Sequence, residues 1–434
     1  MACRPLGAFL GLAFWLHPSR KDWCTLDRMS SVAANLKGTG EKTGSHKKPR
    51  LLIAILTFFV AVIVVSYSFA HPIHDFVEYW TAAHLVVAHH NPYSLGEVFK
   101  MERGIGFEQS VPIMLLSPPW TLPLIAPIGL INSYSLACLF WMIILIAAVA
   151  WSSRLLMDVY FGELRIPEIS DTAFYRCLFA FTFYPVLLCL RYAQTAPLML
   201  LGVAGFLYFD KKARPILAGA FLALTLIKPQ LLYLVWLAVL LRSFQQRRWR
   251  SLASAVGFVA LLSAITLLLD ARSFQQYREL ASTPYLQAYA SGVTAGIRKL
   301  FGGVGTFWIQ LVPPAFGLAW FAVYWHRRRQ NWSWAKNMPM LITISVVTSA
   351  YGWLFDQTLL ALPVIAIAAK RAHASGRLPV SLVFFYTALN CVLMVVMPFP
   401  TLNLLPAPIC IALLLLRDTK SGAVLDSQLD YAAG

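Results

Sequence analysis

The stretch LLIAILTFFVAVIVVSYSFAHPIHDFVEYW, residues 51–80, decides the class of fold. Its first part, Leu51–Ala70, carries no charged side chain and is long enough to cross the hydrocarbon core of a bilayer as a helix. The basic run Lys47-Lys-Pro-Arg50 comes directly before it. Because basic flanks mark the cytoplasmic side of a span, residue 71 is expected to emerge on the extracytoplasmic side.

The composition of the whole chain also indicates a membrane protein. Of 434 residues, 59% are hydrophobic and only 13% are charged, and the mean hydropathy is +0.64. Apolar windows predict about twelve transmembrane helices, so the expected fold is an all-α polytopic membrane protein. We expect a disordered cytoplasmic tail at 1–50, with Met29 as the true start, a membrane domain at 51–416 and a cytoplasmic tail at 417–434.

The net charge of +17 narrows the expected partners. Much of it lies in the N-terminal tail and in short loops such as 242–250 and 326–329, a pattern typical of loops that face the cytoplasm and anionic membrane lipids. No nucleic-acid partner is expected, because no soluble domain carries a basic patch. The seven cysteines show no CxxC spacing, which favours buried apolar residues over a disulfide or metal framework.

The segment 71–112 after the first span is expected to lie outside the cytoplasm. Phe76, Trp80, Ala83 and Val87 recur at helical spacing, which predicts an amphipathic helix along the membrane surface. Asn91-Pro-Tyr93 is expected to end it as a turn. Further spans are expected at 113–131, broken by prolines, and at 134–157, 173–190, 195–210, 215–241, 251–270, 304–325, 338–350, 357–369, 378–397 and 403–416.

The stretch 215–241 allows two interpretations. If the stretch is one continuous helix, the number of spans places both termini in the cytoplasm. The basic run Lys211–Arg214 then lies outside, against the charge rule. A break at Lys228-Pro229 moves that run inside and places Lys228 at a membrane-embedded turn, at the cost of one re-entrant segment elsewhere. The continuous helix is the preferred prediction.

Two carboxylates stand out because acidic residues are scarce. Asp75 and Glu78 lie at the expected membrane exit, next to the aromatic rings of Tyr79 and Trp80. A carboxylate beside rings that stack on a sugar suits acid–base chemistry on a lipid-linked substrate. The alternative is that Asp75 only caps the surface helix. Its neighbour His74 is a second candidate, but the histidine spacing matches no defined metal site, so neither a metal nor another cofactor is indicated.

Polar residues also interrupt later apolar runs. Arg191, Gln194 and Lys228 are candidates because cations suit a phosphate and an amide suits sugar hydroxyls; the alternative is that the cations extend to lipid headgroups. Trp353 and Asp356 form a second aromatic–acid cluster on the expected outer side, where Trp353 could equally be an interfacial anchor.

Several motifs, in order, carry a family resemblance. They are Asp75-Phe-x-x-Tyr79-Trp80, Asn91-Pro-Tyr93, Ser117-Pro-Pro-Trp120, Tyr192-Ala-Gln194, Ala218-Gly219, Lys228-Pro229 and the aromatic turn before Asp356. Together they resemble glycosyltransferase family 87, polytopic enzymes of the GT-C fold that include polyprenol-phosphate-mannose-dependent α-mannosyltransferases. The sequence departs from the family at Tyr351-Gly-Trp353 and at Ala193, which bears on the acceptor and the sugar.

The resemblance implies an inverting transfer of a hexose, with mannose expected, from a polyprenyl-phosphate donor to a lipid or glycan acceptor. It implies Asp75 as general base, with Lys228 and Arg191 on the leaving phosphate. Tyr79, Gln194 and Asp356 would line the sugar or acceptor pocket, together with the other candidates, His74, Glu78, Trp80, Tyr93 and Trp353. The expected location is the bacterial inner membrane, with the active site facing outward.

Two other functions fit parts of the pattern. A lipid or sugar transporter or flippase should show paired halves with ionisable residues near the middle of the membrane, whereas the acids here cluster at the outer boundary. A glycan polymerase or ligase should have a large outer loop late in the chain, whereas the longest expected outer loop is the first one.

Overall fold

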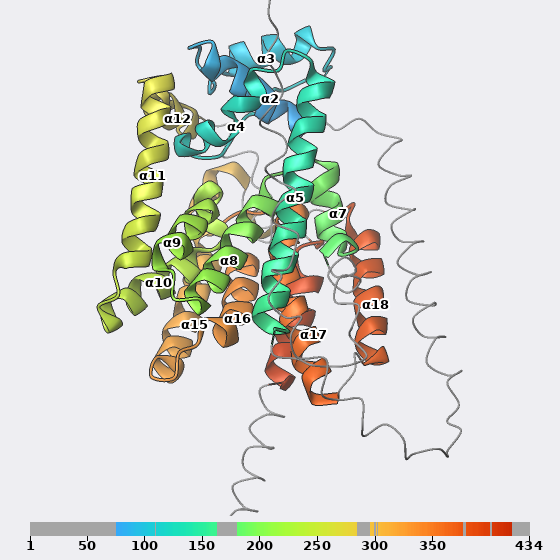
Figure 1. The fold of residues 1–434 in the computed structure, drawn as a ribbon. Helices are drawn as coiled ribbons and strands as arrows, with labels where there is room; N and C mark the ends of the chain where they lie inside the picture. Colours follow the sequence, from blue (N-terminus) through green and yellow to red (C-terminus); the bar gives the residue numbers. More distant parts are fainter. Residues whose placement is uncertain are drawn as a thin grey trace, which may run out of the picture. The chain divides into compact units, whose positions relative to one another are not determined.

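The computed structural model describes residues 75–108, 110–162, 180–283, 296–298, 301, 303–375, 379–399 and 402–418. Within these ranges the regular structure is helical and no strand occurs, in agreement with the expected all-α class (Figure 1). The predicted N-terminal tail, the predicted C-terminal tail beyond residue 418, the predicted first span at 51–70 and the candidate His74 lie outside the described residues.

Helix α2, Phe76–Val87, confirms the helix expected after the first span. The turn at Asn91-Pro-Tyr93 is also confirmed, because the Tyr93 backbone N–H donates to Asn91 Oδ1 at 2.9 Å. The expectation of an amphipathic surface helix was wrong, since nine residues of α2 are buried. Helices α3 (Leu95–Gly104), α4 (Leu122–Gly129) and α5 (Tyr134–Tyr160) all pack against it, so α2 is a core element.

A glycine sets the approach of α4 to α2. A Cβ on Gly129 would lie 2.3 Å from the backbone oxygen of Ala83 on α2, a distance that only a backbone shift could relieve. We expect Gly129→Ala to destabilise the protein by about 1–3 kcal/mol, measured as a lower thermal unfolding midpoint in detergent. Gly257→Ala is the matched control, because a Cβ on Gly257 meets no atom within 4 Å. Equal midpoints for the two variants would contradict the close packing.

The expected span at 113–131 does not form one helix. Residues 112–118 are largely non-helical, and the short 3-10 helix η2 (Pro119–Thr121) leads into the eight-residue α4. The four prolines of this stretch explain the interruption, because each lacks a backbone donor and disfavours a helical residue before it.

Helices α5 and α11 (Arg250–Leu269) are the two described helices that are long and apolar enough to cross a membrane. They confirm long apolar helices where spans were expected at 134–157 and 251–270. Between them lie α8 (Ala196–Lys211), packed on α5, and α9 (Pro215–Ala223), packed on both α8 and α11 (Figure 1). The total of about twelve spans stays a prediction.

The stretch 215–241 is broken, so the preferred continuous helix was wrong. Helix α9 passes into a 3-10 turn, η4 (Leu224–Ile227), and Lys228 leaves the helical region with φ −135° and ψ 78°. After η5 (Pro229–Leu231) the chain resumes as α10, Tyr233–Gln246. The indole of Trp120 donates to Leu226 O at 3.0 Å, which satisfies one backbone group released by the break.

The remaining elements complete the described chain. They are α7 (Tyr184–Arg191), α12 (Ser273–Ala281), η6 (Gly303–Leu311), α15 (Val312–Arg328), α16 (Trp334–Val347), η7 (Leu354–Leu360), α17 (Ala361–Ser375), α18 (Val380–Val396) and a last helix at 406–418. Contacts of η7 with α7, α8 and α16 bring the late aromatic–acid cluster against the middle of the chain.

Candidate active site

A cavity of about 520 Å³ lies where α2, the non-helical 113–118, the end of α7, the break at Lys228 and the turn before η7 meet. Five predicted site residues line it: Asp75, Glu78, Tyr79, Gln194 and Lys228. Trp353, a sixth, lies on its wall as well. Ligand pockets typically have volumes of about 300–1,000 Å³, so the cavity is large enough for a sugar-sized substrate.

Gln194 connects the polar groups of this cavity. Its side-chain nitrogen Nε2 donates to Asp75 Oδ2 at 3.1 Å and to Glu78 Oε1 at 3.2 Å. Its oxygen Oε1 accepts from the Tyr79 hydroxyl at 2.8 Å and from Lys228 Nζ at 3.3 Å. The Gln194 side chain is buried, and both of its amide atoms are used, so it fixes the relative positions of two carboxylates and a cation.

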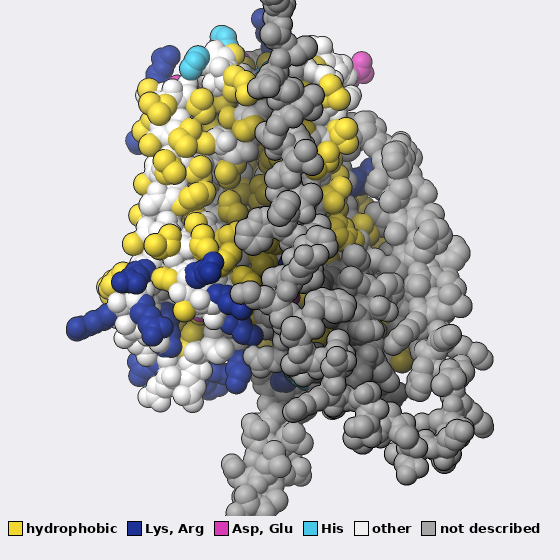
Figure 2. Space-filling view, viewed as in Figure 1, with side chains coloured by type: hydrophobic (Ala, Val, Ile, Leu, Met, Phe, Trp, Pro, Cys, Tyr) yellow, Lys and Arg dark blue, Asp and Glu magenta, His cyan; other side chains and the backbone are white. Residues whose placement is uncertain are grey.

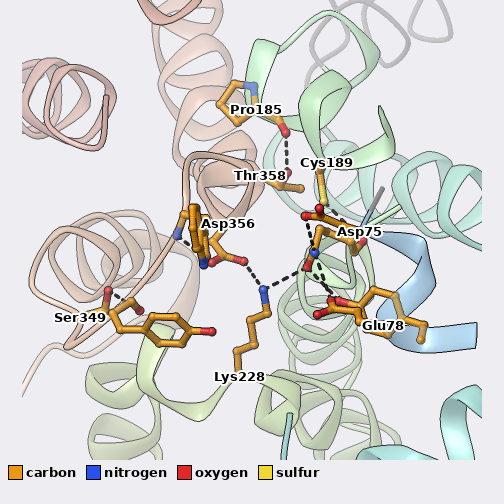
Figure 3. Close-up of polar contacts among 12 residues, drawn as sticks. Asp75, Glu78, Pro185, Cys189, Lys228, Ser349, Asp356 and Thr358 are labelled. Carbon is orange, nitrogen blue, oxygen red and sulfur yellow. Dashed lines mark hydrogen bonds and ion pairs between the residues drawn. The ribbon is translucent and has the colours of Figure 1, made fainter. Parts of the chain in front are cut away.

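Lys228 and Asp356 form a buried ion pair. Lys228 Nζ lies 2.8 Å from Asp356 Oδ1, and Asp356 Oδ2 accepts from the Trp353 backbone N–H at 3.0 Å. Figure 3 shows Asp356 on one side of the Lys228 ammonium and Asp75 with Glu78 on the other. The break in the chain makes this possible, because it places the Lys228 ammonium between the two acidic groups instead of along a continuous helix.

Asp75 sits at the N-cap position of α2, yet its side chain makes no capping hydrogen bond. The carboxylate instead accepts from Gln194, across 119 positions of sequence. The interpretation that this aspartate merely caps its helix is therefore wrong. Its carboxylate belongs to the cavity.

Glu78 carries a strongly perturbed carboxyl group. Burial, followed by the negative charge of Asp75, raises the pKa of Glu78 from 4.5 to about 8. The protonated, neutral form of Glu78 is therefore favoured at neutral pH. A buried carboxyl group with a raised pKa beside a second carboxyl group is typical of acid–base sites.

The sequence model of glycosyltransferase family 87 matches residues 115–350, more than half of the chain. The chain belongs to glycosyltransferase family 87. No curated protein and no solved structure matches it. Family membership makes the protein a glycosyltransferase, and the family together with the apolar helices supports a location in the membrane. The matched range contains Gln194 and Lys228, whereas Asp75 and Asp356 lie outside it.

In this family 87 glycosyltransferase, two predicted site residues, Tyr93 and Arg191, contact residues that line the cavity but do not line it themselves. The Tyr93 hydroxyl donates to Ser117 O at 3.3 Å, and its ring packs edge-on against Tyr277 with centroids 5.3 Å apart. The Arg191 guanidinium lies over the ring of Tyr192, 5.5 Å from its centroid. Ser117, Tyr192 and Tyr277 line the cavity, whereas Tyr93 and Arg191 do not.

Trp80 lies away from the cavity of the glycosyltransferase. Its indole N–H donates to Ile131 O at 3.2 Å, and its ring contacts His84 with centroids 4.1 Å apart. These contacts give Trp80 a packing position between α2 and the end of α4. Within the described residues, no three His, Cys, Asp or Glu side chains are arranged to hold a metal ion.

Sequence reasoning missed several cavity residues. Tyr192 lies two residues before Gln194 in the sequence, and Tyr351 lies two residues before Trp353. This closeness to predicted site residues could have identified both tyrosines. Ser117 was visible as part of a family motif. Tyr277 on α12 and Asn403 carried no signal, because neither lies near a charged or polar interruption of an apolar run.

The raised pKa of Glu78 predicts how stability depends on pH. Its value is 4.5 for the free group and about 8 in the folded protein, so between these values the unfolded chain releases a proton that the folded protein keeps. Glu78 therefore lowers the free energy of unfolding as pH rises from 4.5 through about 8. We expect Glu78→Gln to gain more than about 1 kcal/mol over wild type between pH 5 and pH 9.

Thermal unfolding at the two pH values measures this difference. Asp158→Asn is the control, since Asp158 is exposed on α5 and should leave the wild-type pH dependence unchanged. If the stability of the wild type and that of the Glu78→Gln variant changed with pH in the same way, Glu78 would not be protonated in the folded protein.

Proposed function

We propose that the protein transfers a hexose, with mannose expected, from a polyprenyl-phosphate donor to a lipid or glycan acceptor, inverting the anomeric centre, with Asp75 as general base. The observation that carries the proposal is the Asp75 carboxylate, which lines a 520 Å³ cavity and is not used to cap its own helix. The donor class, the sugar and the inverting course come from the family resemblance.

The proposed reaction is a single displacement. The acceptor hydroxyl gives its proton to Asp75 as its oxygen forms a bond to the anomeric carbon. The bond between that carbon and the phosphate oxygen breaks, and the electron pair leaves with the lipid phosphate. The reaction requires a base within hydrogen-bond reach of the acceptor hydroxyl. Because Glu78 is protonated in this proposal, it adds no second negative charge beside the phosphate.

Lys228 is the proposed partner of the leaving phosphate. An ammonium has three N–H donors, and Asp356 Oδ1 and Gln194 Oε1 accept two of them. Because Lys228 also lines the cavity, its third donor is available to a phosphate oxygen there. Arg191, the other cation predicted for this role, lies outside the lining and is assigned instead to supporting Tyr192.

The cavity walls suit a sugar. Tyr192, Tyr351 and Trp353 present aromatic rings, which pack on the apolar faces of sugars, and Gln230 and Asn403 add amides for hydroxyl groups. We place the protein in the bacterial inner membrane with this cavity on the extracytoplasmic side, following the charge pattern of the loops.

Transfer assays test the proposal. Membranes that carry the wild-type chain should move radiolabelled mannose from polyprenyl-phosphate-mannose into a new glycolipid, and should not use the nucleotide sugar when lipid-linked donor synthesis is blocked. Transfer from the nucleotide sugar alone would contradict the donor class. The absence of transfer from a panel of lipid-linked donors would favour the transporter alternative, which uptake of labelled lipid into vesicles would then examine.

A further inference from the structure

A second cavity, of about 720 Å³, lies at the other ends of the helices that carry the active site. Helix α8 starts two residues after Gln194 and α10 starts five residues after Lys228. Residues near the C-terminal ends of both helices, Asp210 and Gln246 among them, line the second cavity. With a rise of 1.5 Å per residue, helices of 16 and 14 residues separate the two cavities by roughly 20 Å. The second cavity is thus not part of the active site.

Arginine dominates the lining of this second cavity. Asp210 is the one acidic residue of its lining. Five arginines line it: Arg214, Arg242, Arg247, Arg248 and Arg250. None of the five forms an ion pair with a carboxylate among the residues that the structure describes. Figure 2 shows Lys and Arg side chains gathered at one end of the visible face, beyond the hydrophobic side chains. With five arginines and one aspartate in its lining, the cavity carries an excess of positive charge.

Burial and the neighbouring Arg248 lower the pKa of Arg242. The Arg242 guanidinium is held in place by hydrogen bonds of 3.2 Å to Gln245 Oε1 and to Arg329 O. A fixed arginine whose charge is disfavoured by its surroundings is stabilised by an anion.

Three helices begin at this cavity. Its lining includes the first residues of α9 (from Pro215), α11 (from Arg250) and α16 (from Trp334). None of the three has a side-chain cap, and none has an acidic residue in its first turn. Helix N-termini present unpaired backbone N–H groups and a partial positive charge, so they favour an anion.

A buried donor without a partner completes the cavity. Trp332 lines it and is only 8% exposed, and its indole Nε1 has no hydrogen-bond partner among the described residues. Buried N–H groups are normally paired, so this N–H is a candidate donor to a ligand in the cavity.

We propose that this cavity binds a phosphate-bearing ligand, held by the arginines, the three helix N-termini and the Trp332 N–H. Arginine pairs well with phosphate because its planar fork can donate two parallel hydrogen bonds. The cavity is large enough for a phosphate with an attached group. Such a ligand is the headgroup of an anionic lipid or a soluble phosphate compound. The two sources share the same recognition chemistry.

Binding to the full-length protein in neutral detergent tests the site. The thermal unfolding midpoint is measured against increasing pyrophosphate, and separately against short-chain phosphatidylglycerol with phosphatidylcholine as the uncharged comparison. Sodium chloride at matched ionic strength corrects for screening. We expect saturable stabilisation of the wild type. A response to both compounds means that the phosphate group suffices, and a response to the anionic lipid alone means that the headgroup is required.

Three variants locate the response. Arg248→Gln should raise the half-saturating concentration about tenfold, since a charge-assisted hydrogen bond is lost. Trp332→Phe keeps the ring and removes only the N–H, and should raise it roughly threefold. Arg272→Gln, an exposed arginine outside the cavity, should leave it unchanged. The proposal is overturned if neither compound stabilises the wild type, or if Arg248→Gln and Trp332→Phe both respond as the wild type does.

Discussion

Replacing Asp75 by asparagine is expected to lower the rate of sugar transfer by about 10²–10⁴-fold, the usual contribution of a general base. Asparagine has nearly the shape of aspartate but cannot take up the acceptor proton. Its side-chain oxygen can still accept from Gln194 Nε2, so this hydrogen bond is retained. Because Asp75 makes no side-chain cap to α2, the helix loses nothing by the change.

The measurement is the initial rate of transfer from polyprenyl-phosphate-mannose, at equal amounts of folded protein judged by size-exclusion chromatography. Asp158→Asn makes the same atomic change at an exposed position of α5 and should retain the wild-type rate. A well-folded Asp75→Asn variant that transfers sugar as fast as Asp158→Asn would remove Asp75 from catalysis.

Asp75 could be predicted from the sequence because carboxylates are rare in this chain and costly near lipid. The same reasoning found Glu78, Gln194, Lys228 and Asp356, each of which interrupts an apolar setting. Local patterns also predicted α2, α5 and α11, since long apolar or periodic runs need no knowledge of their neighbours.

The pairing of these residues could not be predicted. Lys228 meets Asp356 across 128 positions, and Gln194 meets Glu78 across 116, distances over which periodicity carries no information. The burial of α2 depends on helices that pack against it from later in the chain, so its amphipathic spacing alone suggested an open face. The second cavity was not predicted either. The basic stretches at 211–214 and 242–250 were visible in the sequence, but the meeting of three helix starts that are far apart along the chain was not.

Removing the Lys228 ammonium is expected to have the second large effect, on stability. Lys228 and Asp356 are both buried, so Lys228→Met leaves the Asp356 carboxylate without its counterion. Breaking a buried pair in this way costs about 3–5 kcal/mol, because the remaining charge is neither hydrated nor neutralised. The thermal unfolding midpoint in detergent should fall accordingly, and transfer should be lost.

A double variant separates the two effects. In Lys228→Met with Asp356→Asn, the Asp356 charge is removed together with its counterion, and the asparagine oxygen can still accept from the Trp353 backbone N–H. The double variant should therefore regain more than half of the lost stability. Transfer should not return, because the donor assigned to the leaving phosphate is still missing. Recovery of both properties together would mean that Lys228 serves only to neutralise Asp356, and that the phosphate is held by other groups of the cavity.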